Sequence, residues 1–166
     1  MPSSDWRQPL GQFTVLGHRG AKGHAPENTL ASFAKAVGLQ ANMTELDIHL
    51  SKDGGLIVMH DPRVDRTTNG TGLICELSLA EIKQLDAGSW FGSGFAGEKV
   101  PTLQEVMEFV KGKIALNIEV KAGPEGPYPG IIASAIEHIR SNDMVDSVVV
   151  SSFHREYLLE LRRKAP

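Results

Sequence analysis

The chain has 166 residues, of which 41% are hydrophobic and 22% are charged, and its formal net charge is −3. These values are typical of one ordinary globular domain and argue against disorder, and the acidic balance excludes the basic footprint of a general nucleic-acid binder. The single cysteine, Cys75, excludes an intrachain disulfide and is compatible with a reducing compartment.

The first ten residues, MPSSDWRQPL, lack the pattern of a secretory signal peptide, a basic segment followed by an apolar run. No apolar run in the sequence approaches the roughly 20 residues that a membrane-spanning helix needs. We therefore expect a cytoplasmic protein without stable membrane insertion.

The chain alternates between apolar or β-branched runs, typical of strands, and apolar residues at helical spacing. The expected strands are 13–17, 44–50, 56–60, 114–121 and 147–153. The expected helices are 27–39, 78–88, 102–112, 131–140 and 155–164. Asn28 and Ser78 are the predicted N-caps of the first two helices, and Gly88 is expected near the end of the second. Strands that alternate with helices predict an α/β fold with a parallel sheet.

The span from about 62 to 101 contains one expected helix and is otherwise long and irregular for a connection between two elements. We interpret it as an insertion into a single domain that covers residues 1–166.

Polar side chains gather at the ends of the expected strands, which is where parallel α/β folds carry their chemistry. Strand by strand, the candidates are His18 and Arg19, Glu45 and Asp47, His60 with Asp61, and Glu119 with Lys121. If these strands are neighbours, the candidate groups converge on one rim of the sheet.

Three of the candidates are carboxylates that suit a hard cation. Glu45 and Asp47 are two residues apart on a strand, so both side chains point the same way, and Glu119 could add a third ligand. Three oxygen ligands with room for water favour Mg²⁺ or Ca²⁺ over zinc.

The remaining candidates supply protons and positive charge. His18 and His60 could act as base and acid, and the sequence leaves open which does which. Arg19 offers a planar fork and Lys121 a point charge for one phosphate. Together with a cation, this set is what a metal-assisted attack on a phosphodiester would use.

Each candidate also has a purely structural interpretation. A lone histidine is more often a structural hydrogen-bonding group than a catalyst, and for His24 and His49 either a structural role or solvent exposure is favoured. Strand carboxylates on one face can be the solvated side of an antiparallel sheet. The joint placement at strand ends favours a functional role for His18, His60, Glu45, Asp47 and Glu119.

The order of motifs resembles the glycerophosphodiester phosphodiesterase family, most closely its bacterial cytosolic type. The elements that carry the resemblance are HRG…PENT, ELDIHLSKDG, VMHDPRVDRTTNGTG, LDAGSWF, VPTLQEV, LNIEVK and SSF, from about residue 13 to the end of the chain. Any one of these elements alone would be a weak match, whereas their occurrence in register makes the match specific.

The resemblance implies a TIM (β/α)8 barrel of the phosphodiesterase type, of which this chain covers about the first five βα units. It implies hydrolysis of glycerophosphodiesters, small-molecule substrates, to sn-glycerol 3-phosphate and an alcohol with the help of Ca²⁺ or Mg²⁺. By the family pattern, His18 and His60 are the acid–base pair, Glu45, Asp47 and Glu119 hold the metal, and Arg19 and Lys121 bind the phosphate. The irregular 62–101 span resembles the family's insertion, which covers the site.

The length of the chain departs from the family pattern, because a TIM barrel has eight strands and about 250 residues. Three explanations are open: a piece of a longer enzyme, a barrel completed by self-association as a homo-oligomer, or a shortened relative that binds a phospho-ligand or metal without turnover. A lysophospholipase D-type activity is a further alternative. We expect the first explanation, because all the matched site residues are present.

Overall fold

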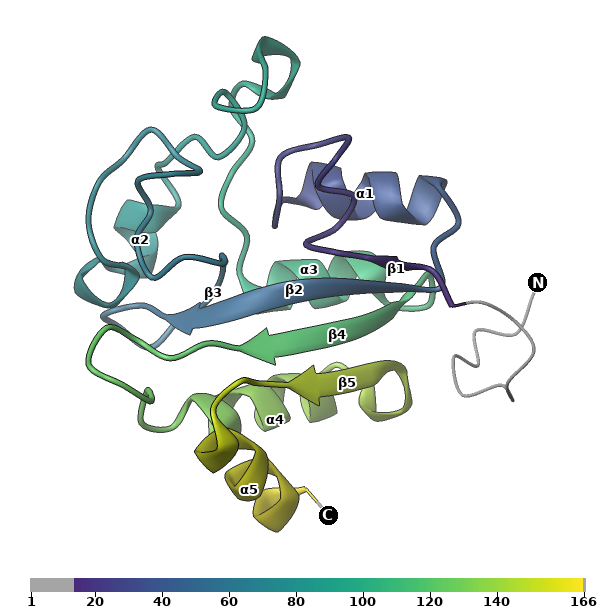
Figure 1. Ribbon diagram of the computed structural model, residues 1–166, viewed down its shortest axis with the longest axis vertical. Helices are drawn as coiled ribbons and strands as arrows, with labels where there is room; N and C mark the ends of the chain where they lie inside the picture. Colours follow the sequence, from purple (N-terminus) through teal and green to yellow (C-terminus); the bar gives the residue numbers. More distant parts are fainter. Residues whose placement is uncertain (1–13, 166) are drawn as a thin grey trace.

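The computed structural model describes residues 14–165; Phe13 of the first expected strand and the N-terminal decapeptide lie outside this range. Four strands form a parallel sheet in the order β1-β2-β4-β5, and their bounds are β1 (Leu16–Gly17), β2 (Met43–Leu50), β4 (Ala115–Val120) and β5 (Val148–Ser151). Figure 1 shows that the arrowheads of β2, β4 and β5 all point to the same side of the molecule. This confirms the predicted α/β class.

The helices largely follow the periodicity of the sequence. Their bounds are α1 (Leu30–Gly38), α2 (Leu79–Ile82), α3 (Leu103–Val110), α4 (Ile131–Ser141) and α5 (Arg155–Lys164). Short 3₁₀ turns lie at Ile74–Glu76, Ser93–Phe95 and Val145–Ser147. Within residues 14–165, none of the helices has both the length and the apolar character that crossing a membrane requires.

The third expected strand forms but is not parallel, so the sheet has four parallel strands rather than five. β3 (Leu56–Val58) pairs antiparallel with β2. The turn between them is tight: Ser51 N–H donates to the Gly55 carbonyl at 2.9 Å, and Gly54 has a φ of +86°. A connection this short permits a hairpin, whereas a parallel crossover needs a dozen or more residues.

Two helix boundaries differ from expectation. Thr29, rather than Asn28, is the N-cap of α1, because its side chain accepts from Ser32 N–H. Ser78 does cap α2, in a capping box with Glu81, but α2 ends at Ile82, well before Gly88. The chain beyond it turns because the Asp86 carboxylate accepts backbone N–H groups at 2.7–2.8 Å from residues 88, 89 and 97.

The main core lies between the sheet and its helices. Leu46 and Ile48 of β2 are fully buried there against apolar residues of α1, α3 and α4. Because side chains alternate along a strand, the intervening residues Glu45, Asp47 and His49 face the opposite side of the sheet. The core packing therefore determines which side of β2 carries the acidic residues.

A second, smaller core is formed by the segment between β3 and α3 together with Ile57 of β3. It contains Met59, Val64, Ile74, Ile82 and Val100, all buried. In Figure 1 this segment, which carries α2, lies on the side to which the arrowhead of β2 points. It is thus packed as a unit of its own beside the strand ends.

Candidate active site at the strand ends

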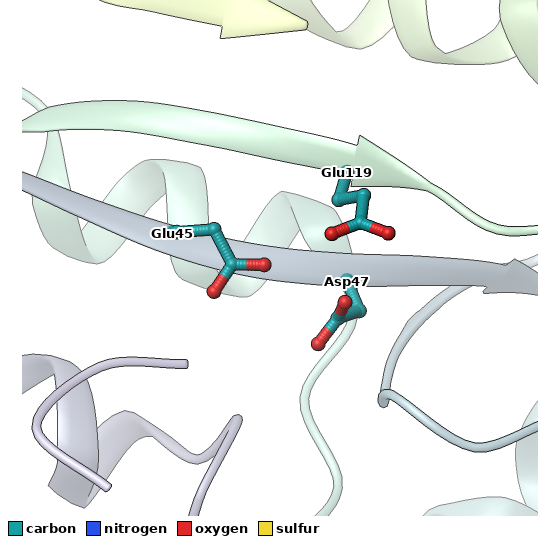
Figure 2. A group of neighbouring side chains, drawn as sticks. All are labelled: Glu45, Asp47 and Glu119. Carbon is teal, nitrogen blue, oxygen red and sulfur yellow. The ribbon is translucent and has the colours of Figure 1, made fainter. Parts of the chain in front are cut away.

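The structure brings the three predicted carboxylates together. Asp47 and Glu119 are direct partners in the parallel register of β2 and β4, and Glu45 lies two residues earlier on β2. Each offers an oxygen within 4.8 Å of the others, and Figure 2 shows them on the same side of the two strands. The parallel pairing and the burial of Glu45 and Asp47 exclude the solvated face of an antiparallel sheet for this pair.

Burial gives this group the character of a cation site. Glu45 and Asp47 are 4% and 0% exposed, and burial, with the negative charge of Asp47, raises the pKa of Glu45 to about 7. The buried oxygens Oε1 of Glu45 and Oδ1 of Asn28 accept no hydrogen bond from the part of the chain that the structure describes. Such acceptors fit a divalent cation, whose preferred ligands are oxygens.

Lys121 lies directly beside the acidic group. Its ammonium is 2.9 Å from Asp47 Oδ1 and also pairs with Glu119. Burial lowers the pKa of Lys121, but hydrogen bonds to the two carboxylates outweigh it and the pKa is raised. Lys121 is therefore a firmly charged group at the edge of the predicted cation site.

Arg19 is held by the turn between β1 and α1. It has a left-handed backbone (φ +52°), and its N–H donates to Glu45 Oε2 at 2.8 Å. Its guanidinium donates to Glu27 at 2.9 Å and lies 3.5 Å from Asp47 Oδ2. Gly20 makes this turn tight, since its φ is +79° and a Cβ there would lie 2.3 Å from the Ser32 hydroxyl.

His18 lies at the rim, with its side chain 48% exposed and its Nε2 3.7 Å from Glu45 Oε2. Partial burial lowers its pKa, and the charges of Lys22 and Arg19 lower it further. Its imidazole is accessible to a small ligand.

His60 reaches the same rim by a route that the sequence pattern did not indicate. β3 runs antiparallel back along β2, and Met59 N–H donates to the Asp47 carbonyl at 3.0 Å. His60 therefore follows directly beside Asp47 because the hairpin is short, and not because it ends a parallel strand. Its Nδ1 is 2.6 Å from Asp61 Oδ1.

The structure adds several residues that sequence reasoning did not assign to the site. Asn28, predicted as a helix cap, is buried and donates to Asp47 Oδ2 at 2.9 Å. Glu27 and Arg66 pair with each other and reach Arg19 and Asp61. The PENT turn contains Glu27 and Asn28, and the longer motif VMHDPRVDRTTNGTG contains Arg66, but no spacing rule indicated their contacts.

His49 proves to be a buried structural group. Its two ring nitrogens lie 3.0 Å from the His60 carbonyl and 3.1 Å from the Tyr128 hydroxyl. The carbonyl can only accept, so Nε2 carries the proton and donates. His24 is exposed. His49 therefore agrees with a structural role and His24 with simple solvent exposure, the two interpretations favoured for them.

A cavity of about 250 Å³ adjoins the site. Its walls include His60, Glu119 and Lys121, together with Phe153 and His154 after β5. Phe153 is 91% exposed, and Lys121 Nζ lies 5.9 Å from the centre of its ring. The cavity therefore places a small molecule within reach of His60, Glu119 and Lys121.

The chain is similar to known proteins over nearly all of its length. It is 46% identical to the glycerophosphodiester phosphodiesterase of Caldanaerobacter subterraneus over 92% of this chain and 63% of that protein. The crystal structure of the glycerophosphodiester phosphodiesterase from Agrobacterium tumefaciens matches with a TM-score of 0.85 and 37% identity, over 93% of this chain and 64% of that one.

A phosphodiesterase from Oleispira antarctica, solved in complex with the product sn-glycerol-3-phosphate, also matches with a TM-score of 0.85 and 39% identity, over 92% of this chain and 62% of that one. The chain thus spans a little under two thirds of the length of these relatives. Its sheet corresponds to part of the TIM barrel of the phosphodiesterase type.

Residues 18–166 match the model of the glycerophosphoryl diester phosphodiesterase family. This match spans every candidate residue of the site, from His18 to Lys121. The chain belongs to the glycerophosphoryl diester phosphodiesterase family.

Proposed function

We propose that this chain carries the catalytic site of a metal-dependent glycerophosphodiester phosphodiesterase, which releases sn-glycerol 3-phosphate and an alcohol. The observation that carries the proposal is the convergence of three carboxylates, two histidines and two cations on one rim. The names of the relatives and the product held by the Oleispira antarctica protein support the substrate class.

In this proposal Glu45, Asp47 and Glu119 hold a Mg²⁺ or Ca²⁺ ion. The geometry supports it, because three oxygens lie within 4.8 Å of one another and Glu45 Oε1 is a buried acceptor without a hydrogen-bond partner. The bound cation would polarise a phosphoryl oxygen and offset the negative charge of the transition state.

The protein's own residues do the remaining work. Arg19 and Lys121 bind and orient the phosphate from opposite sides of Asp47, to which both lie close. His18 and His60 form the acid–base pair: one takes the proton of the attacking oxygen, and the other protonates the leaving oxygen.

We further propose that the chain forms one partial catalytic domain in which residues 62–101 are an insertion beside the site. The separate apolar core of this segment and its contacts to Glu27 support this view. The proposed binding partner is a small glycerophosphodiester substrate. The proposed location of the protein is the cytoplasm.

The test is release of glycerol 3-phosphate from glycerophosphocholine by the purified 166-residue chain, with and without a chelator. We expect release that the chelator abolishes and Mg²⁺ or Ca²⁺ restores. The variant His60→Ala should lower turnover by about 10²–10⁴-fold while cation affinity is retained. His138→Ala on α4 is the matched control, because the His138 ring lies 2.8 Å from the Ser134 carbonyl of its own helix.

Absence of release from a folded, cation-binding sample would contradict the proposal for this chain. It would instead favour a module that binds a phospho-ligand without turnover. The cation titration and the turnover assay thus separate the two functions.

A further inference from the structure

Arg66 has no role in the proposed function, yet its guanidinium contacts Asp61 beside His60 and Glu27 beside Arg19. Its Nε donates to Asp61 Oδ2 at 2.7 Å, and a terminal nitrogen donates to Asp61 Oδ1 at 3.1 Å. The two terminal nitrogens also donate to Glu27, at 2.7 and 3.1 Å. One guanidinium therefore holds two carboxylates at once, each with two hydrogen bonds.

Each of these carboxylates in turn holds a residue of the proposed machinery. Asp61 Oδ1 is 2.6 Å from Nδ1 of His60. Glu27 Oε1 accepts from the guanidinium of Arg19 at 2.9 Å. The contacts form a continuous path from a histidine to a phosphate-binding arginine, and Arg66 is its middle member.

We propose that Arg66 is a positioning residue that links His60 to Arg19 through Asp61 and Glu27. The inference rests on the proposed function for the roles of those two end residues. Among the described residues, Arg66 belongs neither to the three carboxylates of the cation group nor to the lining of the cavity, so its proposed role runs through the carboxylates that it holds.

The chemistry of the two partners favours Arg over any other residue here. A guanidinium is planar and has five N–H donors, so it can bind two carboxylates in a fixed geometry, whereas a lysine ammonium is a point charge. Hydrogen bonds from Arg66 lower the pKa of Asp61 to about 2, so Asp61 stays ionised and accepts only.

An ionised Asp61 determines the tautomer of His60. Since the carboxylate can only accept, Nδ1 of His60 carries the proton, and the neutral ring keeps its lone pair on Nε2. Arg66 thereby keeps the ring oriented and in one tautomer, as the acidic member of a catalytic triad does for its histidine.

Glu27 connects Arg66 to Arg19, as Asp61 connects it to His60. It is 10% exposed, and although burial raises its pKa, hydrogen bonds from Arg66 and Arg19 lower it overall. Without Arg66, the Glu27 carboxylate would lose one of its two arginine partners and would be held less firmly. The guanidinium of Arg19, which binds Glu27, would then also be less fixed in position.

The experiment compares Arg66→Lys and Arg66→Gln with the control Arg63→Gln in the full 166-residue chain. Arg63 lies in the same segment, and its guanidinium pairs with the exposed Asp65 at 3.1 Å rather than with Asp61 or Glu27. We expect both Arg66 variants to lower kcat/KM by about 10–100-fold. Misplacement of His60 should lower kcat, and misplacement of Arg19 should raise KM. Arg63→Gln should leave both constants unchanged.

Two readouts do not depend on turnover. The ¹⁵N chemical shifts of His60 should show one tautomer in the wild type and a mixture of both in the Arg66 variants. The pKa of Asp61, followed by carboxyl ¹³C shifts, should rise from about 2 towards its ordinary value. Both readouts test the link even if the wild-type chain shows no turnover, so the failure of the proposed function and of this inference are distinguishable.

A double-mutant cycle tests the link itself. Glu27→Gln and Asp61→Asn should be non-additive in the wild type, with a combined loss in kcat/KM smaller than the product of the separate losses by at least about twofold. In the Arg66→Gln background the two losses should multiply. Without turnover, the same cycle is read from the ¹⁵N shifts of His60.

The inference is overturned if the Arg66 variants keep the His60 tautomer and the Asp61 pKa of the Arg63 control. It is also overturned if the cycle is additive with Arg66 present. If Arg66→Gln fails to fold, Arg66→Lys and the Glu27→Gln variant decide the question by the same readouts.

Discussion

Asn28 is buried, and its side-chain N–H donates to Asp47 Oδ2 at 2.9 Å. The oxygen of the same side-chain amide, Oδ1, has no hydrogen-bond partner among the described residues. Asn28 also has a left-handed backbone, with a φ of +57°. One residue thus orients a carboxylate of the proposed cation site, adds a buried oxygen beside it and occupies a conformation that few side chains adopt.

The variant Asn28→Gly should weaken Mg²⁺ or Ca²⁺ binding by about 10–100-fold, because it removes the group that orients Asp47 but relieves the backbone. Asn28→Ala should weaken binding similarly and also lower the free energy of unfolding by about 1–3 kcal/mol, since alanine is strained at positive φ. Calorimetric titration measures the cation affinity of the two variants, and urea unfolding measures their stability. Unchanged cation affinity in the glycine variant would remove Asn28 from the site.

Gly20 should not tolerate even a methyl group. Gly20→Ala places a Cβ 2.3 Å from the Ser32 hydroxyl at a φ of +79°, and we expect it to lower the free energy of unfolding by about 2–4 kcal/mol. Gly23→Ala is the matched control in the same loop, because nothing lies within 4 Å of its Cβ. Equal urea midpoints for the two variants would refute the proposed close approach.

The ion pair of Asp61 and Arg66 should make the free energy of unfolding depend on pH in the acidic range. The pKa of Asp61 is about 2 in the folded chain and 3.8 ordinarily, so the folded state favours the ionised form. Its contribution to stability is therefore present above pH 3.8 and is lost as the pH falls towards 2.

Urea unfolding of the wild type and Asp61→Asn between pH 2.5 and 6 checks this dependence. The difference between the two free energies of unfolding should be largest near pH 6 and should narrow below pH 4. Asp143→Asn, at an exposed position, is the control for the loss of a surface carboxylate. A difference in free energy of unfolding that stays constant from pH 2.5 to 6 would contradict the lowered pKa of Asp61.

The two apolar cores should unfold separately. Ile118→Ala in the main core removes a fully buried side chain of β4 and should lower global stability by about 2–5 kcal/mol. Ile74→Ala in the second core should act locally and speed amide hydrogen exchange between residues 64 and 87, with the β4 amides unaffected. Uniform loss of protection in both variants would show that the cores form one cooperative unit.

Local sequence patterns were sufficient for most of the fold. The alternation of Leu46, Ile48 and Leu50 with Glu45 and Asp47 predicted β2 and its two faces, because strand periodicity is a local property. Capping residues such as Ser78 marked helix starts for the same reason, whereas the predicted N-cap of α1, Asn28, lies one residue before the observed one. The direction of strand pairing is not a local property, so the pattern predicted a parallel β3, although the short KDGG turn before it permits a hairpin and not a parallel crossover.

Strand-end placement and motif order, both readable along the chain, predicted seven residues of the proposed site: His18, Arg19, Glu45, Asp47, His60, Glu119 and Lys121. How these residues are held relative to one another is a property of the tertiary fold. The register that pairs Asp47 with Glu119, the return of β3 that brings in His60, and the contacts of Asn28 and Arg66 all join segments far apart along the chain. Such contacts depend on packing and register between elements, which the spacing of residues within one element does not encode.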